Sequence, residues 1–299
     1  MIKNIFALAV LCFFLFIPYT FAKDVASAKL EAEIDDEFRW LQAEAVEFVT
    51  VATKTKVTAQ DAPSVVTVIT GEQIRNMGAR NIIDILRTVP GFDFAHLGLY
   101  PMHTAYVRGI ACVSSEKVKF MIDGHSVQPF WGEPELHFDR LPVTNIRKIE
   151  IIRGPGSALY GNSAFIGVVN IITKQGGDEP SRAGLEFGSY NTVRPYAELS
   201  YKEDDLTAYF FAEHYQTDGY DGVVESDMAS DFYGFAASES REMTSSLRHS
   251  TFHSNITWKN IYFSAFFQDA DSEAPVGVNG VLTNEDEMET YYGYGELGY

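Results

Sequence analysis

The stretch Ile149–Lys174, IEIIRGPGSALYGNSAFIGVVNIITK, holds four glycines beside two apolar runs and can be tested for three kinds of chemistry. Its first two glycines begin the dinucleotide-binding pattern G-x-G-x-x-G, but Leu159 stands where the third glycine belongs. A Walker phosphate loop would need Gly-Lys-Ser/Thr, which is absent. The nucleophile-elbow pattern G-x-S-x-G around Ser163 ends in Phe165. We therefore predict no catalytic residues, no cofactor and no enzyme.

The one metal-ligand pattern that begins well is also incomplete. Asp269-x-Asp271-x-Glu273 opens like the calcium-binding loop of an EF-hand, but Ala274 and Gly280 stand where that loop requires Gly and Glu. The sequence therefore predicts no metal site, while loose cation binding by acidic loops stays an open alternative.

The chain as a whole is acidic. Its 299 residues contain 23 Lys plus Arg against 41 Asp plus Glu, which gives a formal charge of −18. This balance argues against a nucleic-acid partner, because phosphates are bound by basic patches. The length allows about two domains.

The first 22 residues have the pattern of a secretory signal peptide. Lys3 supplies the positive start, Ile5–Ile17 is the apolar core, and small residues predict cleavage after Ala22. An uncleaved membrane anchor is the alternative, but the apolar run is short for a span. Cleavage would remove Cys12 and leave Cys112 without a disulfide partner.

The segment that follows the signal has two parts. Residues 23–46 are an acidic leader, either a short amphipathic helix or disordered. Residues 47–62 begin with Phe48–Thr53, FVTVAT, a composition that favours an extended strand. Because no hairpin partner is evident close by, this strand could add to the sheet edge of another protein. A flexible linker is the alternative.

Compact patterning of mixed helices and strands fills residues 63–180. Ser64–Ile69 favours a strand, and Thr70-Gly-Glu-Gln73 has the form of a capping box that opens a helix. Asn81 can cap a second helix. These elements fit one α+β domain. Further strands are expected at Ala105–Arg108 and Val118–Ile122.

Residues 181–299 lose helical periodicity and alternate between apolar and polar side chains. From the second connection onward, short turns alternate with long acidic segments, as in outer-membrane barrels. A soluble β-sandwich is the alternative, but its strands are usually shorter. Six strands are expected, near 182–189, 193–201, 206–215, 246–258, 261–269 and 289–299.

The fifth of these strands indicates which side chains would face lipid. Alternate positions are apolar, so one set of side chains fits a bilayer and the other fits a polar lumen. The lipid-facing set is Phe263, Ala265 and Phe267, and the lumen set is Tyr262, Ser264 and Gln268. An Arg at a lumen position is expected to be tolerated far better than one at a lipid position.

Several motifs in this order resemble TonB-dependent outer-membrane receptors. They are PSVVTVITGEQI, DILRTVPGFDF, YVRGI, VKFMIDGHSV and the opening stretch IEIIRGPGSALYGNSAFIGVVNIITK. The resemblance implies an α+β plug domain followed by antiparallel transmembrane β-barrel strands, about six of about 22. Because six strands leave an unpaired edge in lipid, the sequence is expected to be an N-terminal fragment with an incomplete barrel.

The resemblance also implies partners and interface residues. Phe48-Val49-Thr50-Val51-Ala52-Thr53 matches the box that pairs with the periplasmic protein TonB. Arg108 and Arg153 would serve the plug–barrel interface, or else cap turns within the plug. The glycines of the opening stretch would allow close packing of the plug against the barrel wall. The expected location is the outer membrane, in contact with lipid.

Two plug loops match the substrate-contacting loops of the family, if Val118–Ile122 runs upward from the periplasmic side. Aromatic and His side chains on such loops suit a large ligand, although each alone is as consistent with local packing. The resemblance implies active transport of a ferric siderophore, with cobalamin second, energised through TonB. A surface binding protein or adhesin is the alternative. The candidate substrate residues are His96, Tyr100, His103, Phe130, Trp131, Glu133 and His137.

Overall fold

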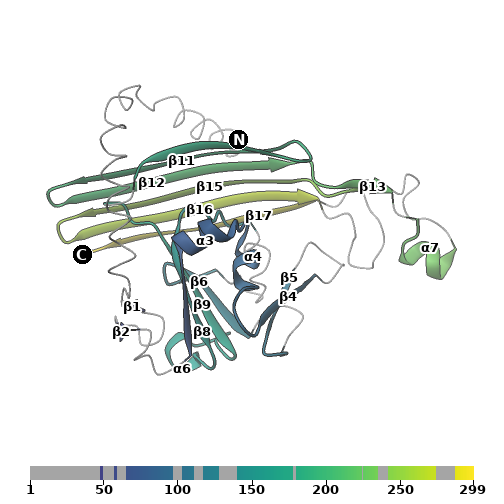
Figure 1. Cartoon of the computed structure of the whole chain (residues 1–299), viewed down its shortest axis with the longest axis horizontal. Helices are drawn as coiled ribbons and strands as arrows, with labels where there is room; N and C mark the ends of the chain where they lie inside the picture. The colour runs from purple at the N-terminus through teal and green to yellow at the C-terminus, as the bar shows by residue number, and fades with distance from the viewer. Residues whose placement is uncertain are drawn as a thin grey trace.

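The structure is a computed structural model in which a long antiparallel sheet lies over a smaller mixed part (Figure 1). We call the smaller part, residues 65–177, the plug, and the long sheet the wall. The residues described are 48–49, 57–58, 65–96, 103–110, 117–127, 140–177, 180–223, 225–234, 242–273 and 287–299. Within these ranges no helix is long and apolar enough to cross a bilayer.

The plug is built on a five-stranded sheet. Strands β6 and β9 run parallel, and the other neighbours are antiparallel. The parallel pair brings the carboxyl ends of β6 and β9 to the same edge, which positions the site described below. The strand order is β3 (Val66–Thr70), β8 (Ile146–Arg153), β9 (Gly167–Thr173), β6 (Val118–Ile122) and β7 (His125–Ser126).

Two short helices cover the plug sheet where the sequence predicted them. Helix α3 (Gly71–Met77) begins with the expected capping box, in which Thr70 and Gln73 exchange side-chain to backbone hydrogen bonds of 2.9 and 3.2 Å. Helix α4 (Ile82–Leu86) begins at Asn81, whose side chain accepts from the Asp84 N–H. Four of the five α4 side chains are buried, so this helix supplies core rather than surface.

The plug core reaches into the wall at one point. Ile82, Ile85, Ile149 and Ile151 are fully buried in a single apolar cluster. Phe266, from a wall strand, belongs to the same cluster and is 2% exposed. Burial of this aromatic ring contributes about 2–3 kcal/mol of contact between plug and wall.

The glycines of the stretch 149–174 serve packing inside the plug. They flank helix α6 (Ser157–Tyr160), which lies on the plug sheet. A Cβ on Gly156 would stand 2.6 Å from Cγ2 of Val168, and Gly161 has φ of 66°, which favours glycine. The close approach at Gly156 is thus to Val168 of the plug, while packing of Gly161 against the barrel wall stays a prediction. Burial and the Glu150 carboxylate raise the pKa of Tyr160 at the end of α6.

The wall contains all six strands that the sequence predicted, most of them longer. Every neighbouring pair is antiparallel and in sequence order. The sheet is open, with β10 and β17 as its edges. The strands are β10 (Arg182–Gly188), β11 (Thr192–Glu203), β12 (Leu206–Thr217), β15 (Leu247–Trp258), β16 (Ile261–Glu273) and β17 (Glu287–Gly298).

The two ends of the wall differ. Residues 218–246 and 274–286 connect strands at one end, the loop end, while Asp204-Asp205 and Lys259-Asn260 make short turns at the other, the turn end. At the loop end, β13 (Asp221–Val223), β14 (Glu242–Thr244) and α7 (Met228–Tyr233) project beyond the wall (Figure 1). The sequence did not predict these three elements, because they are too short for a periodic pattern to show.

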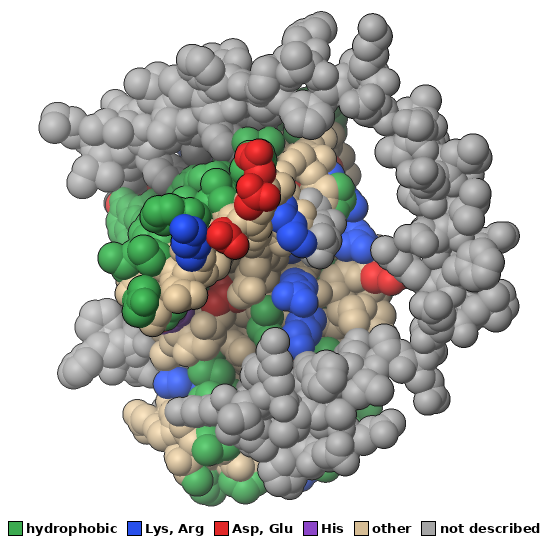
Figure 2. Space-filling view, turned by 90° about the vertical axis from the view of Figure 1, so that its left-hand side faces the viewer, with side chains coloured by type: hydrophobic (Ala, Val, Ile, Leu, Met, Phe, Trp, Pro, Cys, Tyr) green, Lys and Arg blue, Asp and Glu red, His purple; other side chains and the backbone are tan. Residues whose placement is uncertain are grey.

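The alternation on β16 has the predicted sense. Ser264 and Gln268 are buried beneath the plug, while Phe263 on the opposite face is 40% exposed. Figure 2 views the turn end and shows hydrophobic side chains gathered along the sheet, with charged side chains beside them. Trp258, Ile261 and Leu297 are exposed apolar residues near this end. Ser264 is 9% exposed and lines an inner cavity of about 260 Å³, and its tolerance of an Arg stays a prediction.

Phe263→Arg tests the lipid-facing assignment. In the receptor, this change should destabilise barrel assembly by about 2–4 kcal/mol near the bilayer midplane and by less near its surface. Thr257→Arg is the matched control, since it lies at nearly the same depth and lines an inner cavity of about 260 Å³. Heat-modifiable gel mobility measures the folded fraction. Equal losses for both variants would contradict the assignment.

Candidate functional site

The contact between plug and wall starts at the carboxyl ends of β6 and β9. Because these strands are parallel, Asp123 and Thr173 stand side by side. The Asp123 carboxylate accepts from the Thr173 N–H at 2.9 Å and from its hydroxyl at 2.7 Å. Asp123 has φ of 50°, a left-handed conformation that Asp tolerates better than most residues. The Asp-Gly turn therefore points a carboxylate at the wall.

Three wall side chains complete this cluster. The Tyr294 hydroxyl donates to Asp123 at 3.1 Å, and His253 Nε2 lies 3.1 Å from the Thr173 hydroxyl. Asn255 donates to the carbonyl of Lys174 at 3.1 Å. Each plug group at this edge therefore has a polar partner on β15 or β17.

A buried ion pair lies next to this cluster. Lys174 Nζ is 2.7 Å from Glu198 Oε2, and the two side chains are 4% and 3% exposed. The Tyr209 hydroxyl also donates to Glu198, at 3.0 Å, and Arg182 lies 3.8 Å from its other oxygen. A buried charge pair of this kind needs such additional hydrogen bonds to offset the loss of hydration.

Toward the turn end, His125 extends the contact. Its Nε2 lies 3.1 Å from Glu296, and its ring stacks on Tyr294 with centroids 4.0 Å apart. Tyr262 donates to the other Glu296 oxygen at 2.6 Å. The lumen face of β17 thus binds the turn that follows β6 through both a hydrogen bond and a ring contact.

Toward the loop end, Arg140 fixes the plug. It is 2% exposed, and its guanidinium donates to Ser272 at 2.8 Å and Thr290 at 3.0 Å. Its carbonyl accepts from Gln268 at 2.9 Å. A planar guanidinium can bridge two hydroxyls on neighbouring strands, which an ammonium group does less well.

The predicted interface residues Arg108 and Arg153 make their described contacts within the plug. Arg108 donates to the carbonyl of Arg153 at 3.2 Å, and Arg153 donates to the carbonyl of Pro90 at 3.1 Å. Arg153 ends β8 at the edge of the plug sheet opposite to Thr173, away from the six wall strands. Their role at the plug–barrel interface stays a prediction.

The predicted substrate residues are described only in part. His96 and His103 pair across the end of a hairpin formed by β4 (Phe92–His96) and β5 (His103–Val107). This hairpin lies toward the loop end (Figure 1). The carboxyl end of β6 meets the wall at Tyr294, and the substrate role of the loop that follows this strand stays a prediction. Outside the described residues lie Tyr100, Phe130, Trp131, Glu133 and His137.

The predicted TonB box is paired within the chain. Its first residues form β1 (Phe48–Val49), which runs antiparallel to β2 (Val57–Thr58). The expectation that no hairpin partner lies close by is therefore wrong. The β-branched pair Val57-Thr58 suits a strand, and seven intervening residues let the chain turn back. Residues 50–53 of the box lie outside the described ranges.

Two arrangements resemble metal ligands, and neither by itself establishes a site. Oxygens of Asp271, Glu287 and Glu289 lie within 4.8 Å of one another, but such acidic groups are common without an ion. His249 and His253 have the spacing H-x-x-x-H, which pairs ligands on a helix. On strand β15 their Cα atoms are about 13 Å apart, so they cannot share an ion.

Comparison with known proteins gives the family. Residues 58–168 match the family model described as TonB-dependent Receptor Plug Domain. The Vitamin B12 transporter BtuB of Vibrio vulnificus (strain CMCP6) is 34% identical over 141 residues, which is 44% of this chain and 22% of the relative. The chain therefore spans about a fifth of that relative's length.

Solved structures of outer-membrane receptors share the fold. The ferripyoverdine receptor of the outer membrane of Pseudomonas aeruginosa has a TM-score of 0.61 at 16% identity, covering 83% of this chain and 33% of that one. A mutant of the ferric enterobactin receptor PfeA from the same organism has a TM-score of 0.56 at 22% identity, covering 79% and 38%. Residues 58–168 therefore belong to the plug-domain family of TonB-dependent receptors. The described fold, a plug followed by antiparallel strands of an unclosed barrel, is the one that these solved receptors share.

The sequence analysis missed the plug residues that contact the wall. Asp123 directly follows the expected strand Val118–Ile122 and Lys174 ends the stretch Ile149–Lys174, but the sequence analysis gave neither residue a role. A polar residue directly after each of two buried parallel strands was the available signal, since such ends lie together. Nothing local in the sequence marks the others. The missed residues are Asp123, His125, Arg140, Thr144, Thr173 and Lys174.

Glu198→Ala tests the buried ion pair. It leaves the Lys174 ammonium buried without its carboxylate. The free energy that holds the plug on the wall should therefore fall by about 3–5 kcal/mol. The measurement is the urea midpoint at which the plug becomes sensitive to protease. Lys174→Met combined with Glu198→Leu should recover most of the loss. Arg182→Ala is the control, since that partner is 45% exposed and should contribute less than about 1 kcal/mol. A small effect of Glu198→Ala alone would contradict a structural role for the pair.

Proposed function

We propose that the chain is part of an outer-membrane active transporter for a large, scarce nutrient. A ferric siderophore is the first candidate, and cobalamin is the second. The curated relative is named a vitamin B12 transporter, and the structural neighbours are named receptors for ferripyoverdine and ferric enterobactin. Transport is energised by the inner-membrane proton gradient, through TonB bound to residues 48–53.

The polar contact between plug and wall is the observation that supports transport best. Hydrogen bonds and ion pairs hold much of the described contact, and the apolar part is formed by Phe266 with the rings of Tyr292 and Tyr294. Polar groups can exchange a protein partner for water at a net change of about 0.5–1.5 kcal/mol per neutral hydrogen bond. A plug held in this way can shift within the lumen without exposing a large apolar surface.

We propose that substrate binds at the loop end, through the residues named from the family resemblance. Residues 128–139, which contain Phe130, Trp131, Glu133 and His137, begin after Val127 and end at Arg140. Arg140 is bonded to Ser272 and Thr290, near the loop ends of β16 and β17. The end of this segment therefore lies on the side where the long connections are.

The proposal includes export and assembly. Residues 1–22 are the signal peptide, cleaved near Ala22, and 23–46 the acidic leader. Residues 47–62 hold the TonB box and linker. Residues 63–180 are the plug domain, and residues 181–299 are the first part of the barrel. The wall's exposed apolar face then contacts outer-membrane lipid.

Val51→Pro tests energised transport. Proline removes a backbone donor from strand pairing with TonB, so uptake of labelled cyanocobalamin or a ferric siderophore should fall to background while binding persists. Val51 lies outside the pairs that β1 makes with β2, so this change spares them. Ala45→Pro in the leader is the control and should leave uptake intact. Normal uptake with Val51→Pro would favour a binding protein or adhesin that does not transport.

A further inference from the structure

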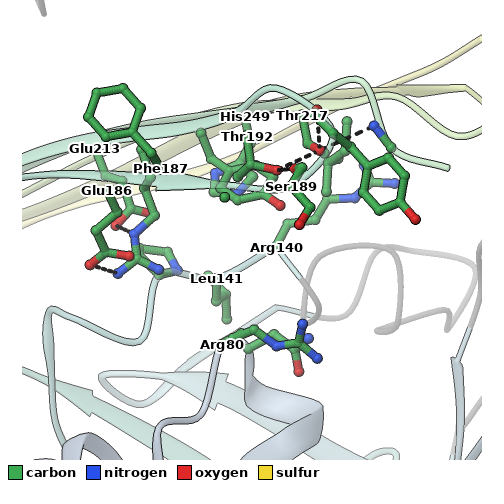
Figure 3. Close-up of a pocket in the computed structure, with 18 residues that line it drawn as sticks. Arg80, Arg140, Leu141, Glu186, Phe187, Ser189, Thr192, Glu213, Thr217 and His249 are labelled. Carbon is green, nitrogen blue, oxygen red and sulfur yellow. Dashed lines mark hydrogen bonds and ion pairs between the residues drawn. The ribbon is translucent and has the colours of Figure 1, made fainter.

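Two cavities lie at opposite ends of the contact between plug and wall. The loop-end cavity, of about 700 Å³, lies between Leu141 of the plug and wall side chains that include His249 (Figure 3). The turn-end cavity, of about 260 Å³, lies between Asp123 of the plug and wall side chains that include Asn255 and Thr257. Among the described wall strands, β15 is the one that lines both cavities.

One row of side chains on β15 joins the two cavities. Alternate residues of a strand point to the same face, so the lumen row runs from His249 through Thr251 and His253 to Asn255. The Cα atoms of His249 and Asn255 are about 20 Å apart at the usual rise of a strand. Thr251 and His253 are both 0% exposed. We call these two the barrier residues, because they separate the cavities along β15.

The plug closes the row at both barrier residues through hydrogen bonds. Gln268 donates from Nε2 to the Thr251 hydroxyl and to the carbonyl of Arg140, each at 2.9 Å. His253 Nε2 lies 3.1 Å from the Thr173 hydroxyl. Water can replace a neutral hydrogen bond of this kind with only a small net change in free energy. The plug can therefore leave the row at these two points by exchanging bonds with water.

The row on β15 is polar over its whole length, unlike the wall on either side of it. At the depth of His253, β12 places Phe211 and β16 places Phe266, which are 0% and 2% exposed. A molecule that moves along β15 can exchange one hydrogen-bonding partner for the next, whereas either ring would bring its polar groups against an apolar surface. The members of the row are His249, Thr251, His253, Asn255 and Thr257.

Two histidines of this row have unused bonding capacity. His249 and His253 are 7% and 0% exposed, and the Nδ1 atom of each makes no hydrogen bond to the described residues. A buried polar atom without a partner is unfavourable. Water or a passing molecule can supply the missing bond once the plug has moved off the row. The unpaired nitrogens thus lower the cost of opening the row.

We propose that the transported molecule passes along the lumen face of β15, and that the barrier residues form the constriction that the plug closes at rest. The inference rests on the proposed transport function and adds its route and the residues that close it. Opening needs the plug segments at Arg140 and Thr173 to move off β15, while the plug cluster beneath α6 stays packed. A route along β12 would lack the turn-end exit, because none of the described residues that line that cavity lies on β12.

Ion conductance tests the constriction without substrate or TonB. In the full-length receptor in a planar bilayer, Thr251→Ala combined with His253→Ala should join the two cavities and convert a closed receptor into a conducting one. Phe211→Ala is the matched control, since it removes a buried ring at the same depth on β12 and should leave the receptor closed. Heat-modifiable gel mobility checks that both variants are assembled. No conductance in the double variant, or equal conductance in both variants, would overturn the proposal.

Thiol labelling tests the route during transport. In a Cys112→Ser receptor in intact cells, Thr251→Cys should react with a membrane-impermeant maleimide while cyanocobalamin or a ferric siderophore is taken up, and not at rest. Ala164→Cys is the control, since Ala164 is also 0% exposed but lies in the plug cluster with Val168. It should stay unlabelled. Labelling of both positions would mean that the whole plug unfolds, and uptake without labelling of Thr251→Cys would place the route elsewhere, so either result counts against the proposal.

The outcomes separate this proposal from the proposed function. Uptake that ignores Val51→Pro counts against energised transport, whereas the conductance of the purified receptor depends on neither TonB nor substrate. Uptake that is abolished by Val51→Pro, together with a double variant that stays closed, would leave the transport function standing and overturn the route along β15.

Discussion

The buried ion pair between Lys174 and Glu198 is the interaction on which the arrangement of plug and wall depends. Lys174 directly follows β9, and Glu198 lies on the second wall strand, so the pair fixes where the plug sheet ends against the barrel. The parallel register of β6 and β9 then sets Asp123 opposite Tyr294. Breaking the pair would leave a charge in a region that excludes water, and the Tyr209 hydroxyl helps to offset this cost by donating to Glu198.

The two faces of the wall contact different surroundings. Side chains such as Phe263 and Leu297 face away from the plug, where only apolar groups suit a bilayer. The inward set, including His253, Thr251 and Gln268, is polar yet almost fully buried, because the plug covers it. A polar residue on a lumen face is thus evidence of either water or a partner, and here the described contacts supply the partner.

Local signals predicted the elements well and the contacts poorly. The capping box at Thr70 and the six wall strands depend on neighbouring residues or on alternation, so sequence alone shows them. The bond between Tyr294 and Asp123 joins residues 171 positions apart, and no local pattern records such a pair. Gly156 is a further example, because its residue type signals a close approach but only the fold shows that the neighbour is Val168.

The polar contacts set the position of the plug more than its net adhesion. Hydrophobic contact is not directional, so Phe266 alone would allow the plug to slide or turn on the wall. Hydrogen bonds require both distance and angle, so Arg140 can bridge Ser272 and Thr290 in one placement only. With Arg140 near the loop end and His125 near the turn end, both translation and rotation are fixed. Water can replace any one of these hydrogen bonds, but losing all of them at once is unfavourable. Together they therefore specify the orientation of the plug.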